Sequence, residues 1–181
     1  IRYSKNLQLV KIVGPSGSGK TSLALAIIEE LKADKDLVVG YVNFRDVGSE
    51  WELVKKYVEA MFNAMGIPDY RWGLINEENF KTTLFANCYD LPSIYAARLG
   101  KKIIAVIDDF EGIYTLPNAD RIVNHFKALC KNPYKGPKNT TVLICQSSEI
   151  VKARTTSIRH PLSDFGITID LLALDEDSWI K

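Results

Sequence analysis

The chain has 181 residues, of which 46% are hydrophobic and 25% charged, and it carries 23 basic side chains against 22 acidic ones. A chain of this length buries about 70% of the surface that it exposes when unfolded, so it can fold around one apolar core without disulfides or a structural metal. The balanced charge excludes a protein that holds nucleic acid by its overall charge alone, because such domains carry a clear basic excess.

The cysteines and the apolar runs indicate a protein inside the cell. Cys88, Cys130 and Cys145 lie in apolar stretches and form no C-x-x-C pair, which is typical of reduced, buried thiols. No apolar run approaches the roughly 18 residues of a membrane span, so we expect no membrane partner and a cytoplasmic, nucleoid or nuclear location. Because the chain begins at Ile1 rather than Met, we also expect it to be part of a longer protein.

The first predicted strand, residues 8–13, leads into a complete G-x-x-x-x-G-K-[ST] motif, and an amphipathic helix follows. In such a phosphate loop, glycines let backbone N–H groups point inward while the helix directs its positive end at the same point, so that a polyphosphate is bound. Lys20 is expected to reach the β- and γ-phosphates, and Thr21 to ligate Mg²⁺. The predicted ATP-binding residues are Gly14, Pro15, Ser16, Gly17, Ser18, Gly19, Lys20, Thr21 and Ser22.

Strands and helices then alternate. A second strand is predicted over residues 37–44, and the capping box Ser49-Glu50-Trp51-Glu52 starts a helix that Gly66 ends. A further helical segment is expected over residues 77–100, with a break at Pro92. This alternation predicts a parallel sheet with helical crossovers.

The third strand, residues 103–108, ends in two consecutive acids, Asp108 and Asp109. Nothing in strand formation favours two carboxylates at the end of an apolar run. A Mg²⁺–nucleotide site needs them, one to hold a metal-bound water and one to orient the attacking water. We therefore assign Asp108 to the metal and Asp109 to catalysis.

A helix over residues 119–131 precedes a fourth strand, residues 141–146, which ends in Gln146-Ser147-Ser148. If this strand lies between the first and the third, Gln146 or Ser147 can hydrogen-bond the γ-phosphate or the attacking water. The alternative is that these polar residues, Ser148 above all, cap a helix after a buried strand.

Two basic regions are candidates for contacts with partners. Arg154 and Arg159 precede the fifth strand, residues 167–172, where oligomeric ATPases place an arginine that reaches into a neighbour's site, which makes Arg159 a candidate catalytic residue. The other region surrounds the loop before the fourth strand and fits either a local contact with double-stranded DNA or an ordinary solvated loop. Its members are Lys127, Lys131, Lys135 and Lys138.

Together these motifs resemble the P-loop ATPases of the ASCE division, and among them the AAA+ and STAND-type ATPases, which include the replication-initiator and archaeal ATPase families. The resemblance implies an α/β fold of three layers, with a five-stranded, mainly parallel sheet in the order 5-1-4-3-2. It takes residues 1–172 as the ATPase core and residues 173–181 as the start of a C-terminal lid or linker. It further implies an ATP- and Mg²⁺-dependent ATPase, in a homo- or hetero-oligomer, that acts on DNA or a nucleoprotein assembly as initiator, loader or remodeller.

Two positions depart from the pattern of these families. Asp109 stands where the second acid is usually Glu, and Gln146 stands where Ser, Thr or Asn is commoner. The carboxylate of Asp109 is set back by one methylene, and a displacement of about 1 Å can reduce a rate roughly 10²-fold. Either hydrolysis is slow, or Glu111 or a bridging water compensates.

Three other functions remain as alternatives. Asp108-Asp109-Phe110 and Gln146 also resemble FtsK/HerA-type DNA translocases and viral genome-packaging ATPases, in which the corresponding strand ends in Gln. A small-molecule P-loop kinase is about this size. Such a kinase needs several arginines in a mobile lid to hold the transferred phosphoryl group, and this sequence offers only Arg154 and Arg159 in that region. A nucleotide-gated binding module with weak turnover is the third alternative, and Asp109 is the residue that suggests it.

Overall fold

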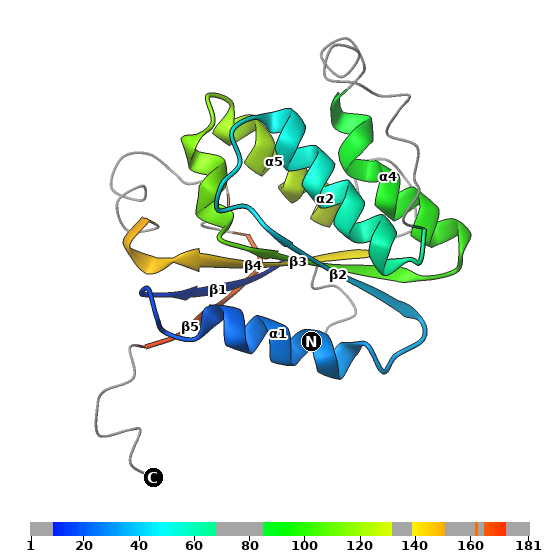
Figure 1. Cartoon of the computed structure of the whole chain (residues 1–181), viewed down its shortest axis with the longest axis horizontal. Helices are drawn as coiled ribbons and strands as arrows, with labels where there is room; N and C mark the ends of the chain where they lie inside the picture. The colour runs from blue at the N-terminus through cyan, green and yellow to red at the C-terminus, as the bar shows by residue number, and fades with distance from the viewer. Residues whose placement is uncertain (1–8, 68–84, 132–138, 151–161, 163–164, 173–181) are drawn as a thin grey trace.

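The computed structural model describes residues 9–67, 85–131, 139–150, 162 and 165–172. They form three layers, with a β-sheet between helix α1 on one face and helices α2, α4 and α5 on the other (Figure 1). This confirms the predicted α/β architecture. The strands are β1 (Leu9–Gly14), β2 (Leu37–Asn43), β3 (Lys102–Asp108), β4 (Thr140–Ser147) and β5 (Ile167–Asp170). The helices are α1 (Lys20–Leu31), α2 (Glu50–Ala64), α4 (Phe85–Arg98), α5 (Ala119–Lys131) and the 3₁₀ helix η2 (Phe110–Thr115).

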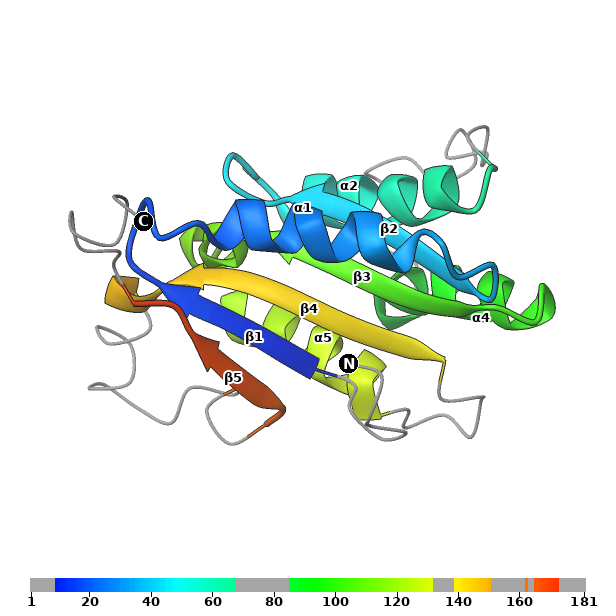
Figure 2. The same ribbon diagram turned by 90° about the horizontal axis from the view of Figure 1, so that it is seen from below.

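All strands of the sheet run parallel, in the order β2-β3-β4-β1-β5 (Figure 2), which is the predicted order read from the other edge. Strand β4 lies between β1 and β3, and its register places Ser147 opposite Gly14. On the other side of β3, Asn43 lies opposite Asp108. Because parallel strands present their carboxyl ends at one edge, the residues that follow β1, β2, β3 and β4 meet there.

The central strands β1, β3 and β4 are buried on both faces, whereas the residues of the edge strand β5 are exposed. Ile12 and Ile28 belong to the core between the sheet and α1. The larger core on the opposite face contains an aromatic group around Phe126, whose ring lies edge-on to Tyr57 and Tyr89 at centroid distances of 5.5 and 5.4 Å. Burial on both faces explains why strands such as β3 and β4 read as nearly continuous apolar runs.

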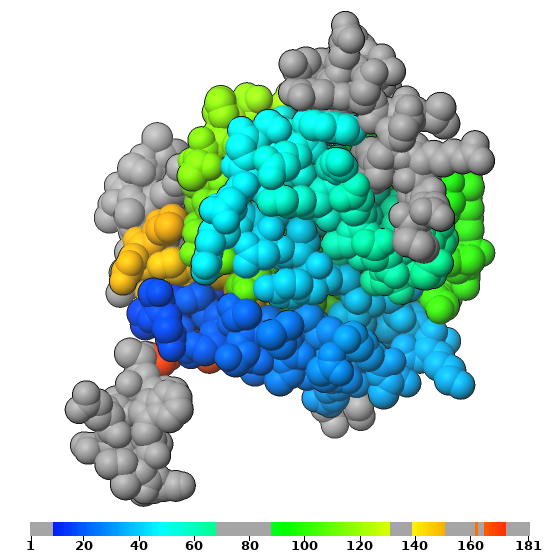
Figure 3. All heavy atoms as spheres, in the orientation of Figure 1, coloured from blue at the N-terminus to red at the C-terminus, as the bar shows by residue number. Residues whose placement is uncertain are grey.

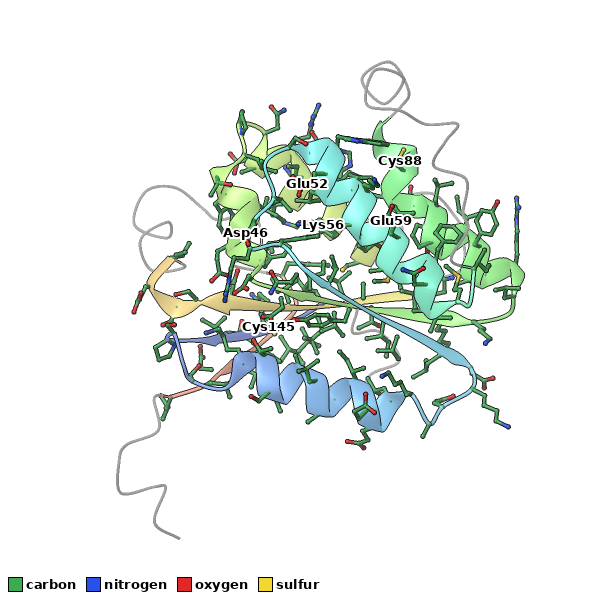
Figure 4. The ribbon with its side chains drawn as sticks, in the orientation of Figure 1. Asp46, Glu52, Lys56, Glu59, Cys88 and Cys145 are labelled. Atoms are coloured by element: carbon green, nitrogen blue, oxygen red, sulfur yellow. The ribbon has the colours of Figure 1, made fainter. Side chains whose placement is uncertain are left out.

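The three cysteines are free and buried, which confirms their predicted packing role. Cys88 lies on α4 and Cys145 on β4 (Figure 4). Burial raises the pKa of Cys130 and of Cys145 to about 12, so neither thiol carries an appreciable thiolate fraction near neutral pH.

Helix α2 begins and ends as the sequence predicts. Ser49 Oγ accepts a hydrogen bond from Glu52 N at 3.2 Å, and Glu52 Oε2 accepts one in return from Gly48 N at 2.9 Å. The helix ends before Gly66, which has the left-handed φ of 76° that glycine adopts without strain. Among the described helices, none has the length and apolarity that crossing a bilayer requires.

The helix break expected at Pro92 is wrong. Helix α4 continues through Pro92 to Arg98. A proline inside a helix costs about 3 kcal/mol, and the burial of Tyr89 and Ala96 on either side of it in the core offsets this cost. The first part of the expected helix, residues 77–84, lies outside the described residues.

The close approach of η2 to the end of β2 gives a stability test. A Cβ at Gly112 would overlap the backbone carbonyl of Phe44, whereas a Cβ at Gly48 would lie 3.6 Å from its nearest neighbour. We expect Gly112→Ala to lower the free energy of unfolding by about 2–3 kcal/mol, because the backbone must move to relieve the overlap. Gly48→Ala, the matched control, should change it by less than about 1 kcal/mol. Urea denaturation followed by circular dichroism measures both, and equal stabilities would contradict this packing.

Candidate functional site

The loop between β1 and α1 has the backbone of an anion site. Gly17 and Gly19 have φ values of 78° and 85°, a left-handed conformation that favours glycine. Gly19 is the N-cap of α1, no side chain caps the helix, and its first turn contains no acidic residue. The N–H groups of this turn, together with the positive end of the helix, therefore suit a phosphate group.

Lys20 is directed back over this loop. Its Nζ donates hydrogen bonds to the carbonyl oxygens of Gly14 at 3.0 Å and Pro15 at 2.8 Å. Gly14 has no room for a side chain, because a Cβ there would lie 2.5 Å from Ser18 Oγ and 2.8 Å from the Leu171 carbonyl oxygen. The positive charge of Lys20 is thus held at the point where β1 enters the loop.

The first turn of α1 is joined to the end of β3 through Asp108. Thr21 Oγ1 donates to Asp108 Oδ2 at 2.7 Å, and the Tyr41 hydroxyl donates to the same oxygen at 3.0 Å. Burial, followed by this hydrogen bond, raises the pKa of Tyr41 to about 12. The predicted partners Thr21 and Asp108 are therefore in direct contact.

The oxygen atoms of Thr21 and Asp108 fit Mg²⁺. This ion prefers hard oxygen ligands and is usually held by one or two protein groups together with phosphates and water. Within the described ranges, no group of three or more His, Cys, Asp or Glu side chains could hold a metal by itself. The described part of the chain thus offers a small set of oxygen ligands rather than a complete metal cage.

Asp109 is engaged by residues at the end of β2. Its Oδ2 accepts a hydrogen bond from Asn43 Nδ2 at 2.7 Å and lies 3.0 Å from Arg45 Nε in an ion pair. Its backbone has φ 47° and ψ 46°, the left-handed region that non-glycine residues seldom occupy, and its N–H donates to Asp108 Oδ1 at 3.0 Å. Sequence reasoning gave no role to Tyr41, Asn43 or Arg45, although polar residues ending a strand beside the acidic one are a usable signal.

Glu111 reaches the end of β4 instead. Its Oε1 accepts a hydrogen bond from Ser147 N at 3.2 Å, and its Oε2 is buried without a hydrogen-bond partner among the described residues. Burial raises the pKa of the Glu111 carboxyl, the Asp109 carboxylate raises it further, and the charge of Lys20 opposes both effects.

Gln146 is also buried at this edge, with 3% exposed surface, and its Oε1 makes no hydrogen bond to a described residue. The expectation that β4 lies between β1 and β3 is confirmed. The alternative role, in which a polar side chain here caps the following turn, applies to Ser147 rather than Ser148, because Ser147 Oγ accepts a hydrogen bond from Glu149 N at 3.3 Å.

The basic regions are only partly visible. Lys127 lies with its Nζ 5.7 Å from the ring centre of Phe165, a cation–π contact. Four of the other predicted basic residues lie outside the described residues: Lys135, Lys138, Arg154 and Arg159. Lys131 ends α5, but its side chain is not described.

This fold and this loop define a P-loop ATPase domain, as the sequence predicts. The chain belongs to the family of ATPase domains found predominantly in Archaea, whose family model matches residues 3–179. No protein of curated function matches the chain.

Several solved structures are similar. The Aeropyrum pernix ORC2 protein, in ADPNP–ADP complexes, matches with a TM-score of 0.68 at 14% identity over 95% of this chain and 43% of its own. The Aeropyrum pernix ORC1 protein in complex with DNA has a TM-score of 0.64 at 14% identity, over 92% of this chain and 39% of its own. A Walker-type ATPase of Pyrococcus abyssi has a TM-score of 0.57 at 15% identity, over 96% of this chain and 51% of its own.

These similarities show that the chain shares the fold of these proteins. The chain spans about half the length of these proteins or less. The family match agrees with the archaeal ATPase family named in the sequence interpretation.

The Tyr41–Asp108 hydrogen bond can be tested by removing one oxygen atom. We expect Tyr41→Phe to lower the free energy of unfolding by about 1–2 kcal/mol, because the buried carboxylate of Asp108 loses one of its hydrogen-bond donors. The matched control is Tyr57→Phe, because the Tyr57 hydroxyl is buried without a hydrogen-bond partner among the described residues. That variant should be neutral or slightly more stable. Thermal and urea unfolding compare the two, and a Tyr41→Phe protein as stable as the wild type would refute the interaction.

Proposed function

We propose that this domain binds ATP with Mg²⁺, hydrolyses it, and uses the hydrolysis to act on double-stranded DNA or a nucleoprotein assembly. The observation that carries the proposal is the 2.7 Å contact between Thr21 and Asp108. It joins the helix behind the phosphate loop to the acidic end of β3. A triphosphate on the loop would therefore lie beside both of the side chains that suit its metal ion.

Each residue of the site has a role in this proposal. Backbone N–H groups of residues 14–22 bind the phosphates, and Lys20 leaves the carbonyl oxygens of Gly14 and Pro15 to pair with the β- and γ-phosphates. Thr21 and Asp108 would hold Mg²⁺, which neutralises charge on the phosphates when bound. Gln146 reports whether the γ-phosphate is present, and Asp109 and Glu111 are the two acids available to orient water.

Action on DNA is supported by the structural neighbours. The Aeropyrum pernix ORC1 protein was solved in complex with DNA, and so was the Drosophila ORC, at a TM-score of 0.52. With 23 basic and 22 acidic side chains, this domain has no charge excess of its own. DNA binding is therefore shared between subunits of a homo- or hetero-oligomer, in which Arg159 reaches a neighbour's nucleotide.

Gln146 supports a second candidate function. A glutamine at the end of the strand between β1 and β3 is the feature that resembles DNA-translocating and genome-packaging ATPases. Such a motor would share the nucleotide site and differ in moving along DNA rather than loading or remodelling a complex on it.

Nucleotide binding is tested by Lys20→Ala. The variant should fold normally but bind ATP roughly 100-fold more weakly, because a charged hydrogen bond of about 3 kcal/mol is lost. Lys35→Ala, an exposed lysine after α1, is the matched control and should bind ATP like the wild type. Calorimetric titration with ATP and Mg²⁺ measures both, and undiminished affinity in the Lys20 variant would refute this placement of the nucleotide.

Action on DNA is tested by measuring ATP turnover with and without duplex DNA at two salt concentrations. We expect DNA to raise the turnover rate, and the increase to shrink at higher salt because phosphate contacts weaken. Movement along the duplex in the same preparation would select the translocase. ADP formation that depends on an added small-molecule acceptor would select a kinase, and ATP binding without turnover would select a nucleotide-gated module.

A further inference from the structure

The two acids after Asp108 point to opposite sides of β3. Asp109 is bound by Asn43 and Arg45 at the end of β2, whereas Glu111 is bound by the backbone N–H of Ser147 on β4. The space-filling view shows the end of β1 beside the end of β4 at one side of the molecule (Figure 3). The two carboxylates therefore differ in their distance from the phosphate loop.

The strand order makes this difference large. Strand β4 is the direct neighbour of β1, and Ser147 lies opposite Gly14, the first residue of the phosphate loop. Strand β2 is three strand spacings from β1, each of about 4.8 Å. The carboxylate of Glu111 is thus held at the end of β4, next to the strand that carries the loop, and that of Asp109 is held at the end of β2, the most distant strand on that side.

The two acids also differ in whether a carboxylate oxygen is left to accept a hydrogen bond from water. Asp109 Oδ2 is occupied by two donors, one of them charged. Glu111 uses Oε1 to accept the Ser147 N–H, while its buried Oε2 has no partner among the described residues. A buried carboxylate oxygen is costly unless it accepts a hydrogen bond, so Oε2 is suited to a donor brought in with the substrate, and water is the smallest such donor.

The backbone holds Glu111 in this position. The left-handed turn at Asp109 leads directly into η2, where the Gly112 N–H donates to the Asp109 carbonyl at 2.9 Å. Phe110 and Ile113 are fully buried on either side of Glu111. The carboxylate is therefore fixed by a packed element and by the Ser147 N–H, which is the kind of preorganisation that catalysis requires.

We propose that Glu111, rather than Asp109, is the catalytic residue that orients the attacking water and accepts its proton. The inference rests on the proposed ATP hydrolysis. The oxygen of the water forms a bond to the γ-phosphorus, and its proton passes to Glu111 Oε2. The bond from the γ-phosphorus to the bridging oxygen breaks, its electron pair leaves with ADP, and the proton is then released to phosphate or solvent. Asp109 instead anchors Asn43 and Arg45 to the end of β3.

The experiment compares Glu111→Gln with the matched variant Asp109→Asn in the full chain. Each variant replaces a carboxylate with an amide of the same shape. We expect Glu111→Gln to lower the turnover rate about 100-fold or more, the usual contribution of a general base, with ATP affinity within about threefold of the wild type. Asp109→Asn should lower turnover less than about tenfold.

A second readout does not depend on turnover. ADP with aluminium fluoride imitates the planar phosphoryl group and the water in line with it, so Glu111→Gln should weaken binding of this complex and leave binding of ADP alone unchanged. Glu111→Asp, which keeps the charge but shortens the side chain, should fall between wild type and Glu111→Gln in both assays.

Each other outcome overturns the inference. A large loss of turnover in Asp109→Asn would show that Asp109 orients the water. It would do so alone if Glu111→Gln keeps its turnover, and together with Glu111 if that variant also loses it. A Glu111→Gln protein that turns over normally or loses ATP binding would give Glu111 no catalytic role, and unfolding of both Glu111 variants would make it a structural residue. A wild-type protein that binds ATP without turnover would refute the proposed hydrolysis itself, which distinguishes the two failures.

Discussion

The site depends on one buried carboxylate. Asp108 is only 2% exposed, and it accepts hydrogen bonds from three parts of the chain: Thr21 at the start of α1, Tyr41 on β2 and the backbone N–H of Asp109. An ionised group in such a place is stable only when donors surround it. Asp108 therefore fixes the phosphate-loop helix, the edge strand β2 and the turn into η2 relative to one another.

Much of the site's geometry follows from the position of β4. Because β4 separates β1 from β3, the polar groups at its end lie between the phosphate loop and the acids, in contact with the Glu111 side of η2. Strand β2 on the far side of β3 supplies a different set of polar groups, which hold Asp109. The two acids that the sequence places two residues apart are thereby separated into different environments.

The strands and the phosphate loop could be predicted because each depends on a strong local pattern, whereas the strand order was implied by the resemblance to ASCE ATPases. Two-sided burial makes strands such as β3 and β4 continuous apolar runs, and the loop motif requires glycines at fixed spacing. The role of Asn43 could not be predicted in the same way, because a polar residue that ends a strand looks like the start of a loop until the neighbouring strand is known. The prediction of a helix break at Pro92 was wrong for a related reason. It used only the local effect of proline and could not include the burial of Tyr89 and Ala96 in the core.

The left-handed backbone at Asp109 restricts which amino acids suit that position. Short polar side chains such as Asp and Asn tolerate φ near 47°, because they can hydrogen-bond locally, while longer unbranched ones such as Glu are disfavoured by roughly 1–2 kcal/mol. A turn of this shape thus selects Asp at the position where related ATPases usually carry Glu. Asp109 is the non-glycine residue with a left-handed φ among the described residues, so the longer acid Glu111 meets no such restriction two residues later.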